Sequence, residues 1–136
     1  MINHERTLII FKPDAVQRGI VGEILSRFEK AGLKIIGTKM VQPDKDHYFH
    51  HYENIGKMIS RRGQKAFDVT ISMMNEGPVI AFVLEGVESV ALVRKMVGTT
   101  EPKSALPGTV RGDYSHMSFS YADANEVGVP NILHAS

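Results

Sequence analysis

Two arginines, a threonine and a Pro-Gly turn lie close together in the second half of the sequence. Arg94 and Thr100 precede the turn, and Arg111 follows it. A guanidinium group donates two parallel hydrogen bonds to phosphate oxygens, and glycine lets the backbone approach a ligand closely. This stretch therefore predicts a phosphate-binding loop. In the alternative interpretation, Arg111 pairs with Asp113 or Glu101 and only holds a long loop together.

A lysine and a histidine complete the set of residues suited to phosphate chemistry. Lys12 directly follows the apolar run at 7–11, so its ammonium group is expected where a strand ends. His134 closes another apolar run, beside the small residues Ala135 and Ser136. Neutral imidazole is a nucleophile near pH 7, and the phosphoramidate that it forms can pass its phosphoryl group on. The pattern favours phosphoryl transfer at His134, whereas either residue on its own would be interpreted as structural.

The apolar pattern predicts the elements that must position these residues. Short apolar runs predict strands at 7–11, 33–41, 78–84 and 131–134. Amphipathic spacing and stop signals predict helices at 21–28, 44–54, 64–75 and 87–97. Residues 55–63 are expected to form a basic, glycine-flanked connector. The chain therefore reads β-α-β, helical connector, β-α-loop-β.

This order predicts an α/β (α+β) protein with the ferredoxin-like split βαβ fold, an antiparallel four-stranded sheet with helices packed on it. The first and third strands are almost continuously apolar, so we expect them in the centre, covered on both faces. The second strand is interrupted by Lys34, Gly37 and Lys39, which suits an edge position. Because only two long amphipathic helices are available as covers, some apolar surface is expected to remain for a partner subunit.

Composition narrows the class of protein. The chain has 136 residues, of which 43% are hydrophobic and 23% charged, as is typical of one globular domain. The net charge of +1 disfavours a broad basic face for nucleic acid. The lack of cysteine excludes disulfides and thiolate sites. Neither a signal sequence nor a membrane-spanning run is recognised, so a cytoplasmic location is expected.

Taken together, the motifs resemble those of the nucleoside diphosphate kinases, in order along almost the whole chain. The matching stretches are Phe11-Lys12-Pro13-Asp14-Ala15-Val16, Glu85-Gly86, Gly98-Thr99-Thr100-Glu101-Pro102, Pro107-Gly108-Thr109-Val110-Arg111-Gly112-Asp113 and Asn131-Ile132-Leu133-His134-Ala135-Ser136. The resemblance implies ping-pong transfer of the γ-phosphoryl group from a nucleoside triphosphate to His134, and then to a nucleoside diphosphate. It also implies Mg²⁺ bound through the nucleotide phosphates, and a homo-oligomer, tetramer or hexamer.

The resemblance assigns roles residue by residue. Tyr52 matches a tyrosine close to the catalytic histidine, so the implied catalytic residues are His134, Lys12 and Tyr52. The family's base-stacking aromatic falls on Ala66 here, and Phe67 is the predicted substitute, although it could equally be a core residue. The nucleotide-binding residues implied are Lys12, Phe67, Arg94, Thr100, Arg111 and Asn131.

The sequence departs from the family pattern at several places. One insertion precedes Phe67, and a second, roughly at 115–130, separates the phosphate loop from His134. Residues 1–136 are expected to form a single domain that lacks the family's usual C-terminal tail. One alternative is therefore a non-catalytic or weakly active nucleotide-binding module. Another is an RNA-binding ferredoxin-like domain, but it would need exposed aromatics where Phe11 and Phe82 are predicted to be buried.

A histidine cluster lies outside these motifs. The spacing of His47, His50 and His51 could present two imidazoles to one metal ion on a helix. No carboxylate or fourth histidine follows at a suitable spacing, so a solvated helix face is the simpler interpretation and no metal ligand is predicted.

Overall fold

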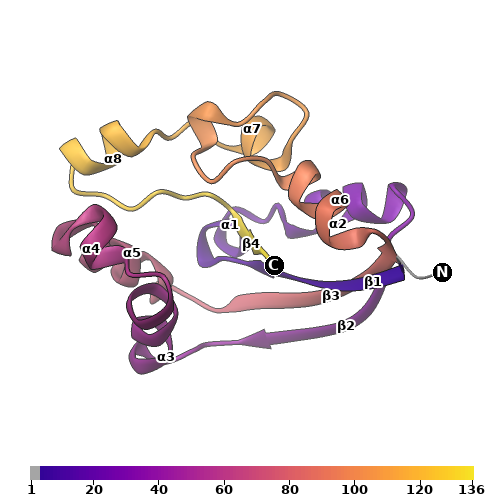
Figure 1. Ribbon diagram of the computed structural model, residues 1–136, viewed down its shortest axis with the longest axis horizontal. Coiled ribbons are helices and arrows are strands. Elements are labelled where there is room, and N and C mark those ends of the chain that lie inside the picture. Colours follow the sequence, from indigo (N-terminus) through magenta and orange to yellow (C-terminus); the bar gives the residue numbers. More distant parts are fainter. Residues whose placement is uncertain (1–3) are drawn as a thin grey trace.

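An antiparallel sheet forms the centre of the structure, a computed structural model that describes residues 4–136 (Figure 1). Its strands are β1 (His4–Phe11), β2 (Lys34–Val41), β3 (Val79–Val87) and β4 (Leu133–Ala135), in the order β2-β3-β1-β4. Every neighbouring pair is antiparallel. The predicted ferredoxin-like sheet, with the first and third strands in the centre and the second at an edge, is confirmed.

The helices confirm three of the predicted segments and add others. Those at 21–28, 64–75 and 87–97 correspond to α2 (Val21–Lys30), α5 (Gln64–Met74) and α6 (Ser89–Val97). The segment 44–54 is instead the short helix α3 (Lys45–Phe49) followed by a π-helix, η1 (His50–Ile55). The sequence patterns did not indicate α1 (Pro13–Arg18), α4 (Met58–Arg62), η2 (Pro102–Ser104), α7 (Val110–Tyr114) and α8 (Phe119–Ala124).

The core lies between one face of the sheet and two helices, α2 and α6, which run above it (Figure 1). Phe11 and Phe82 meet there edge to face, with ring centroids 5.8 Å apart. Both rings are buried, as the sequence predicted. The helices contribute the apolar faces that their spacing indicated, through Ile24, Phe28, Val93 and Val97. This packing fixes the ends of β1 and α6, where Lys12 and Arg94 are found.

The opposite face of the sheet is less covered than predicted. Leu8 and Val83 face each other across β1 and β3 and are only half-buried. Helix α5 and the segment before it cover only one end of this face, where Tyr48, Met74 and Val79 form a second cluster with Ile10. The expected cover on both faces is therefore incomplete on this side of the sheet, in agreement with the expectation that some apolar surface remains uncovered.

The edge strand β2 also exposes apolar side chains. Met40 is 58% exposed, and Ile36 and Val41 are exposed beside it. None of the helices within residues 4–136 is long and apolar enough to cross a membrane.

Candidate active site

A cavity of about 700 Å³ lies at the end of the sheet, where β1, β4, η1 and the loop after α6 converge. Within the described part of the chain, its walls contain lysine and arginine but neither aspartate nor glutamate. All the predicted site residues other than Phe67 line it, namely Lys12, Tyr52, Arg94, Thr100, Arg111, Asn131 and His134. A pocket with this charge suits a polyphosphate.

His134 enters the cavity from β4, where it lies opposite Ile10 of β1. The strand is reached through a γ-turn at Ile132, which has a φ of 79° and is closed by the Leu133 N–H donating to the Asn131 carbonyl at 2.9 Å. A β-branched residue in this region of φ costs about 1–3 kcal/mol. Ile132 is fully buried, so the packing around it holds the turn and, with it, the position of His134.

The surroundings of His134 keep its imidazole neutral. Burial lowers its pKa from 6.5 to about 4, and the charges of His51, Lys12, Arg111 and Arg94 act in the same direction. A histidine with this pKa carries a free lone pair at neutral pH. The site therefore presents a neutral nucleophile inside a cationic pocket.

Lys12 joins the end of β1 to the segment that carries His134. Its Nζ donates to Asn131 Oδ1 at 2.7 Å, and its backbone N–H donates to the Ile132 carbonyl at 2.9 Å. Asn131 in turn donates from Nδ2 to the Thr100 carbonyl at 3.2 Å. Burial and the nearby Arg111 lower the pKa of Lys12 to about 8, against the opposing charge of Asp14. Lys12 is thus a cation at neutral pH, and it can release its proton at a pH only slightly higher.

Arg111 is buried, and its guanidinium binds backbone carbonyls on both sides of the γ-turn. Its Nε donates to the Asn131 carbonyl at 3.0 Å, its Nη1 to the Gly98 carbonyl at 3.1 Å and its Nη2 to the Leu133 carbonyl at 2.5 Å. Two of its five N–H donors have no acceptor among the described residues and remain for a ligand in the cavity. The loop-holding interpretation is therefore right about the role of Arg111 but wrong about its partners, which are backbone carbonyls. Burial lowers the pKa of Arg111 to about 10, so the group stays charged at neutral pH.

The carboxylates expected as alternative partners of Arg111 are engaged elsewhere. Asp113 pairs with Arg27 at 2.8 Å. Glu101 accepts from the backbone N–H of Phe119 at 2.8 Å and from the hydroxyl of Ser104. These contacts order the phosphate loop without neutralising its cations.

Arg94 and Tyr52 line the same cavity as His134 from two different elements. Arg94, on α6, is exposed and donates from Nε to the Ser136 carbonyl at 2.8 Å, so its guanidinium lies across the end of β4. Tyr52, on η1, is half-buried, and burial together with the charges of Tyr48 and Asp14 raises the pKa of its hydroxyl. Tyr52 therefore remains a hydrogen-bond donor at any physiological pH.

Comparison with known proteins identifies the family and the fold of this chain. The family model described as nucleoside diphosphate kinase matches residues 5–136. The chain belongs to the nucleoside diphosphate kinase family. It is accordingly a phosphotransferase that uses nucleotide substrates, as its motifs predicted, and a non-catalytic binding module is not favoured.

Relatives support the family assignment over most of their length. The nucleoside diphosphate kinase of Borreliella burgdorferi is 43% identical over 136 residues, which span 97% of this chain and 78% of that protein. That of Pyrococcus furiosus is 47% identical over 97% of this chain and 74% of the relative.

Solved structures give the same result. A transition-state mimic of the Borrelia burgdorferi enzyme with bound vanadate and ADP superposes with a TM-score of 0.88 and 41% identity, covering all of this chain and 80% of that one. The Halobacterium salinarum enzyme in complex with CDP gives a TM-score of 0.78 at 36% identity, covering 97% and 76% of the two chains.

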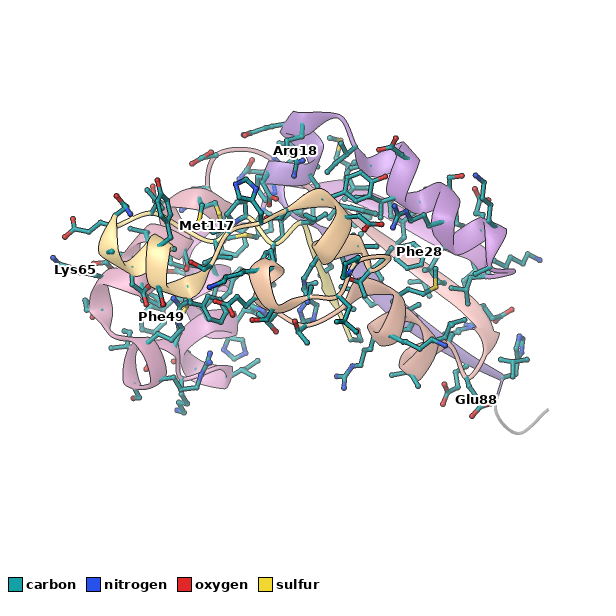
Figure 2. All side chains as sticks on the ribbon, turned by 90° about the horizontal axis from the view of Figure 1, so that it is seen from above. Arg18, Phe28, Phe49, Lys65, Glu88 and Met117 are labelled. Atoms are coloured by element: carbon teal, nitrogen blue, oxygen red, sulfur yellow. The ribbon has the colours of Figure 1, made fainter. Side chains whose placement is uncertain are left out.

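Phe67 does not occupy the position that the motif comparison gave it. Its ring is buried in a cluster with Met58 and Ala66, and Phe49 packs edge to face on it at 5.6 Å. Phe49 and Lys65 both lie at the outer end of the molecule (Figure 2). Phe67 is thus a core residue, the alternative that the sequence left open, and its place does not support a role in stacking on a base.

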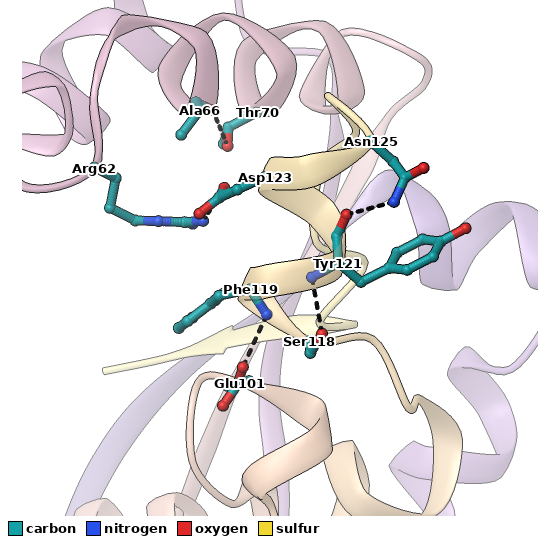
Figure 3. A network of polar contacts seen from close by, with 9 residues as sticks. All are labelled: Arg62, Ala66, Thr70, Glu101, Ser118, Phe119, Tyr121, Asp123 and Asn125. Carbon is teal, nitrogen blue, oxygen red and sulfur yellow. Dashed lines mark hydrogen bonds and ion pairs between the residues drawn. The ribbon is translucent and has the colours of Figure 1, made fainter.

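Phe119 and Arg62 line the cavity instead, and the motif comparison missed both (Figure 3). The Arg62 guanidinium lies over the Phe119 ring, 4.4 Å from its centroid, and pairs with Asp123 at 2.8 Å. Both residues fall in segments where the chain departs from the family pattern, so no motif could have identified them. The available signal was an aromatic residue inside the insertion that precedes β4.

The histidine cluster is divided by the structure. All three side chains are exposed, but only His51 lines the cavity, and His47 and His50 lie outside its lining. The interpretation as a solvated helix face agrees with the exposure of all three histidines, although His51 also lines the cavity. Within residues 4–136, no group of three histidine, aspartate or glutamate side chains is arranged to hold a metal ion.

Proposed function

We propose that His134 accepts the γ-phosphoryl group of a nucleoside triphosphate and passes it to a second nucleoside diphosphate. The observation that carries this proposal is a neutral imidazole, with a pKa near 4, inside a pocket walled by cations. A ring nitrogen attacks the γ-phosphorus, and the N–P bond forms as the bond to the β–γ bridging oxygen breaks. That oxygen leaves with the electron pair as part of the first diphosphate. In the second half-reaction, a β-phosphate oxygen of the incoming diphosphate displaces the imidazole.

Different side chains around His134 contact the phosphates and the sugar of the nucleotide. Arg94, Thr100 and the two unengaged N–H groups of Arg111 contact phosphate oxygens, which neutralises charge that develops in transfer. Lys12 and Asn131, already joined at 2.7 Å, contact the sugar hydroxyls, and Lys12 also reaches the phosphates. The protonated hydroxyl of Tyr52 donates a hydrogen bond beside the reacting histidine.

Mg²⁺ fits this pocket as a companion of the nucleotide. The walls offer cations and neutral oxygens in the described chain, so the oxygen ligands that Mg²⁺ prefers come from the phosphates themselves. When bound, the ion withdraws charge from the phosphate oxygens and so assists their displacement.

The base is held in the outer half of the cavity by Phe119. The backbone N–H of Phe119 donates to Glu101, and the Arg62 guanidinium lies over one face of the ring. Stacking on an aromatic face accepts every base, so we propose broad use of purine and pyrimidine nucleotides in ribose and deoxyribose forms.

Assembly is proposed through the uncovered parts of the sheet. Edge strand β2 exposes Ile36, Met40 and Val41, and the neighbouring sheet face is only half-buried. Pairing of two copies along β2 would cover this edge, and further contacts would build the tetramer or hexamer typical of the family. Light scattering at micromolar concentration is the test, and a single active species near 15 kDa would contradict assembly. We also propose a cytoplasmic location, which the absence of cysteine supports.

Labelling tests the central step. Incubation with γ-labelled ATP is expected to give an acid-labile, base-stable protein phosphate, and His134→Ala is expected to abolish both the label and turnover. His47→Ala is the matched control, because His47 lies outside the cavity. Labelling that survives in His134→Ala would disprove the assignment of His134.

A further inference from the structure

One histidine of the cluster contacts the reacting histidine directly. The rings of His51 and His134 have centroids 5.5 Å apart and stand at 90° to each other. On its other side, His51 meets the ring of Tyr52 at 4.8 Å and 82°. His51 therefore lies between the tyrosine and the nucleophile, at the mouth of the cavity.

The π-helix explains how two consecutive residues reach the same cavity. In η1 the turn is wider than in an α-helix, and both His51 and Tyr52 line the pocket. The wider turn requires Gly56, because a Cβ there would lie 2.9 Å from the Tyr52 carbonyl oxygen. His50, one residue earlier, instead lies against Asn54 along the helix. Wide turns of this kind occur frequently at functional sites.

We propose that His51 is a positioning residue for phosphoryl transfer: its imidazole packs at a right angle on His134 and fixes the plane of the reacting ring. The proposal rests on the proposed role of His134 as nucleophile. Small misplacements of a reacting group cost rate steeply, so a packed ring that removes one rotational freedom is expected to raise the rate of transfer. The ring of Tyr52 packs against the ring of His51. This packing keeps the contact between His51 and His134 ordered although His51 is exposed to solvent.

The electrostatic environment adds a second, separable effect. The charged and titratable groups that face His134 are Lys12 directly after β1, Arg94 from α6, Arg111 from α7 and His51 from η1. Burial is the largest cause of the lowered pKa of His134, and each of these groups lowers it further. Burial, Lys12, His47 and His50 likewise lower the pKa of His51. Replacing His51 by a residue that cannot titrate removes one of these influences, so the pKa of His134 should rise.

Three variants test the proposal in single-turnover labelling with γ-labelled ATP. His51→Ala removes the ring contact and is expected to slow phosphoenzyme formation about tenfold with little change in KM. His51→Phe keeps an aromatic ring and is expected to recover most of that loss. In His51→Phe the acidic limb of the rate should also move to higher pH, and the NMR titration of the His134 ring should move with it. His50→Ala, one residue away and outside the cavity, is the matched control and should behave as the parent protein.

The outcomes separate this proposal from the assignment of His134. Unchanged rate and pH profile in both His51 variants would overturn it, as would a rise in KM alone, because that would indicate substrate binding rather than positioning. If His51→Ala unfolds, the rate and pH profile of His51→Phe decide the question. Label that persists in His134→Ala would contradict the assignment of His134 as the nucleophile, and His51 would then have no reacting ring to position.

Discussion

Arg111→Lys tests whether the buried guanidinium holds the strained turn before His134. The substitution keeps the positive charge but replaces a planar fork by a single ammonium group. Arg111 donates to three backbone carbonyls, those of Gly98, Asn131 and Leu133. A lysine reaching from the same position can satisfy only one of them well, so two buried carbonyls lose a charge-assisted partner.

The expected loss follows from those contacts. Hydrogen bonds to charged groups contribute about 1.5–3 kcal/mol each, and neighbouring losses do not add fully. We therefore expect Arg111→Lys to lower the free energy of unfolding by about 3 kcal/mol, which corresponds to a fall in Tm of roughly 10 °C for a domain of this size. The rate of His134 phosphorylation should fall as well, because the γ-turn at Ile132 sets the position of the ring.

Urea denaturation and thermal unfolding measure the effect, with Arg61→Lys as the control. Arg61 also donates to a backbone carbonyl, that of Gly56 at 2.6 Å, but it is exposed. Its substitution should cost no more than about 0.5 kcal/mol. If Arg111→Lys costs as little as Arg61→Lys, the three contacts do not hold the turn and the reasoning fails.

Further predictions concern pH and the base. Activity should fall as the pH drops through about 4, where His134 gains a proton. KM should rise as the pH passes about 8, where Lys12 loses its proton. A flat kcat/KM between about pH 3 and 10 would refute both assignments. Phe119→Ala should raise KM about tenfold, more for purines than for pyrimidines, and equal KM values would exclude stacking there. Phe67→Ala should leave KM unchanged but destabilise the fold by about 3–5 kcal/mol. Rates with the common diphosphates should agree within about a thousandfold, and a larger spread would require hydrogen bonds to the base edge.

Much of the fold was predictable because its signals are local. The apolar runs that became β1 and β3, and the spacing of Ile24 and Phe28 in α2, depend only on residues close in sequence. Helix α1 was not predicted, because Pro13 was interpreted only as the end of a strand, whereas proline also occurs in the first turn of a helix. The short helices α7 and α8 form around Thr109 and Ser118 caps, which resemble ordinary loop residues in the sequence.

Site residues that belong to sequence motifs could be predicted. Contacts between residues that are far apart in the sequence could not. Lys12, Arg111 and His134 could be named from their motifs, but the bonds of Arg111 to backbone carbonyls depend on a turn that no sequence pattern indicates. The motif comparison left Phe67 open between a base-stacking and a core role, because a motif gives position along the chain and not the direction of the side chain, and the structure places Phe67 in the core. Phe119 lines the cavity with the guanidinium of Arg62, 57 positions earlier in the chain, over its ring, a contact that no local pattern indicates.

The bond between Lys12 and Asn131 joins residues 119 positions apart, so the pocket and the fold are completed in one event. A chain whose β4 has not docked has the phosphate loop but lacks the Asn131 partner of Lys12 and the Ile132 carbonyl that receives its N–H. Nucleotide binding and docking of β4 are then linked equilibria, and each must favour the other. A higher substrate concentration thus raises the fraction of molecules in which β4 is docked, and amide exchange of the Leu133–Ala135 segment should slow as nucleotide is added.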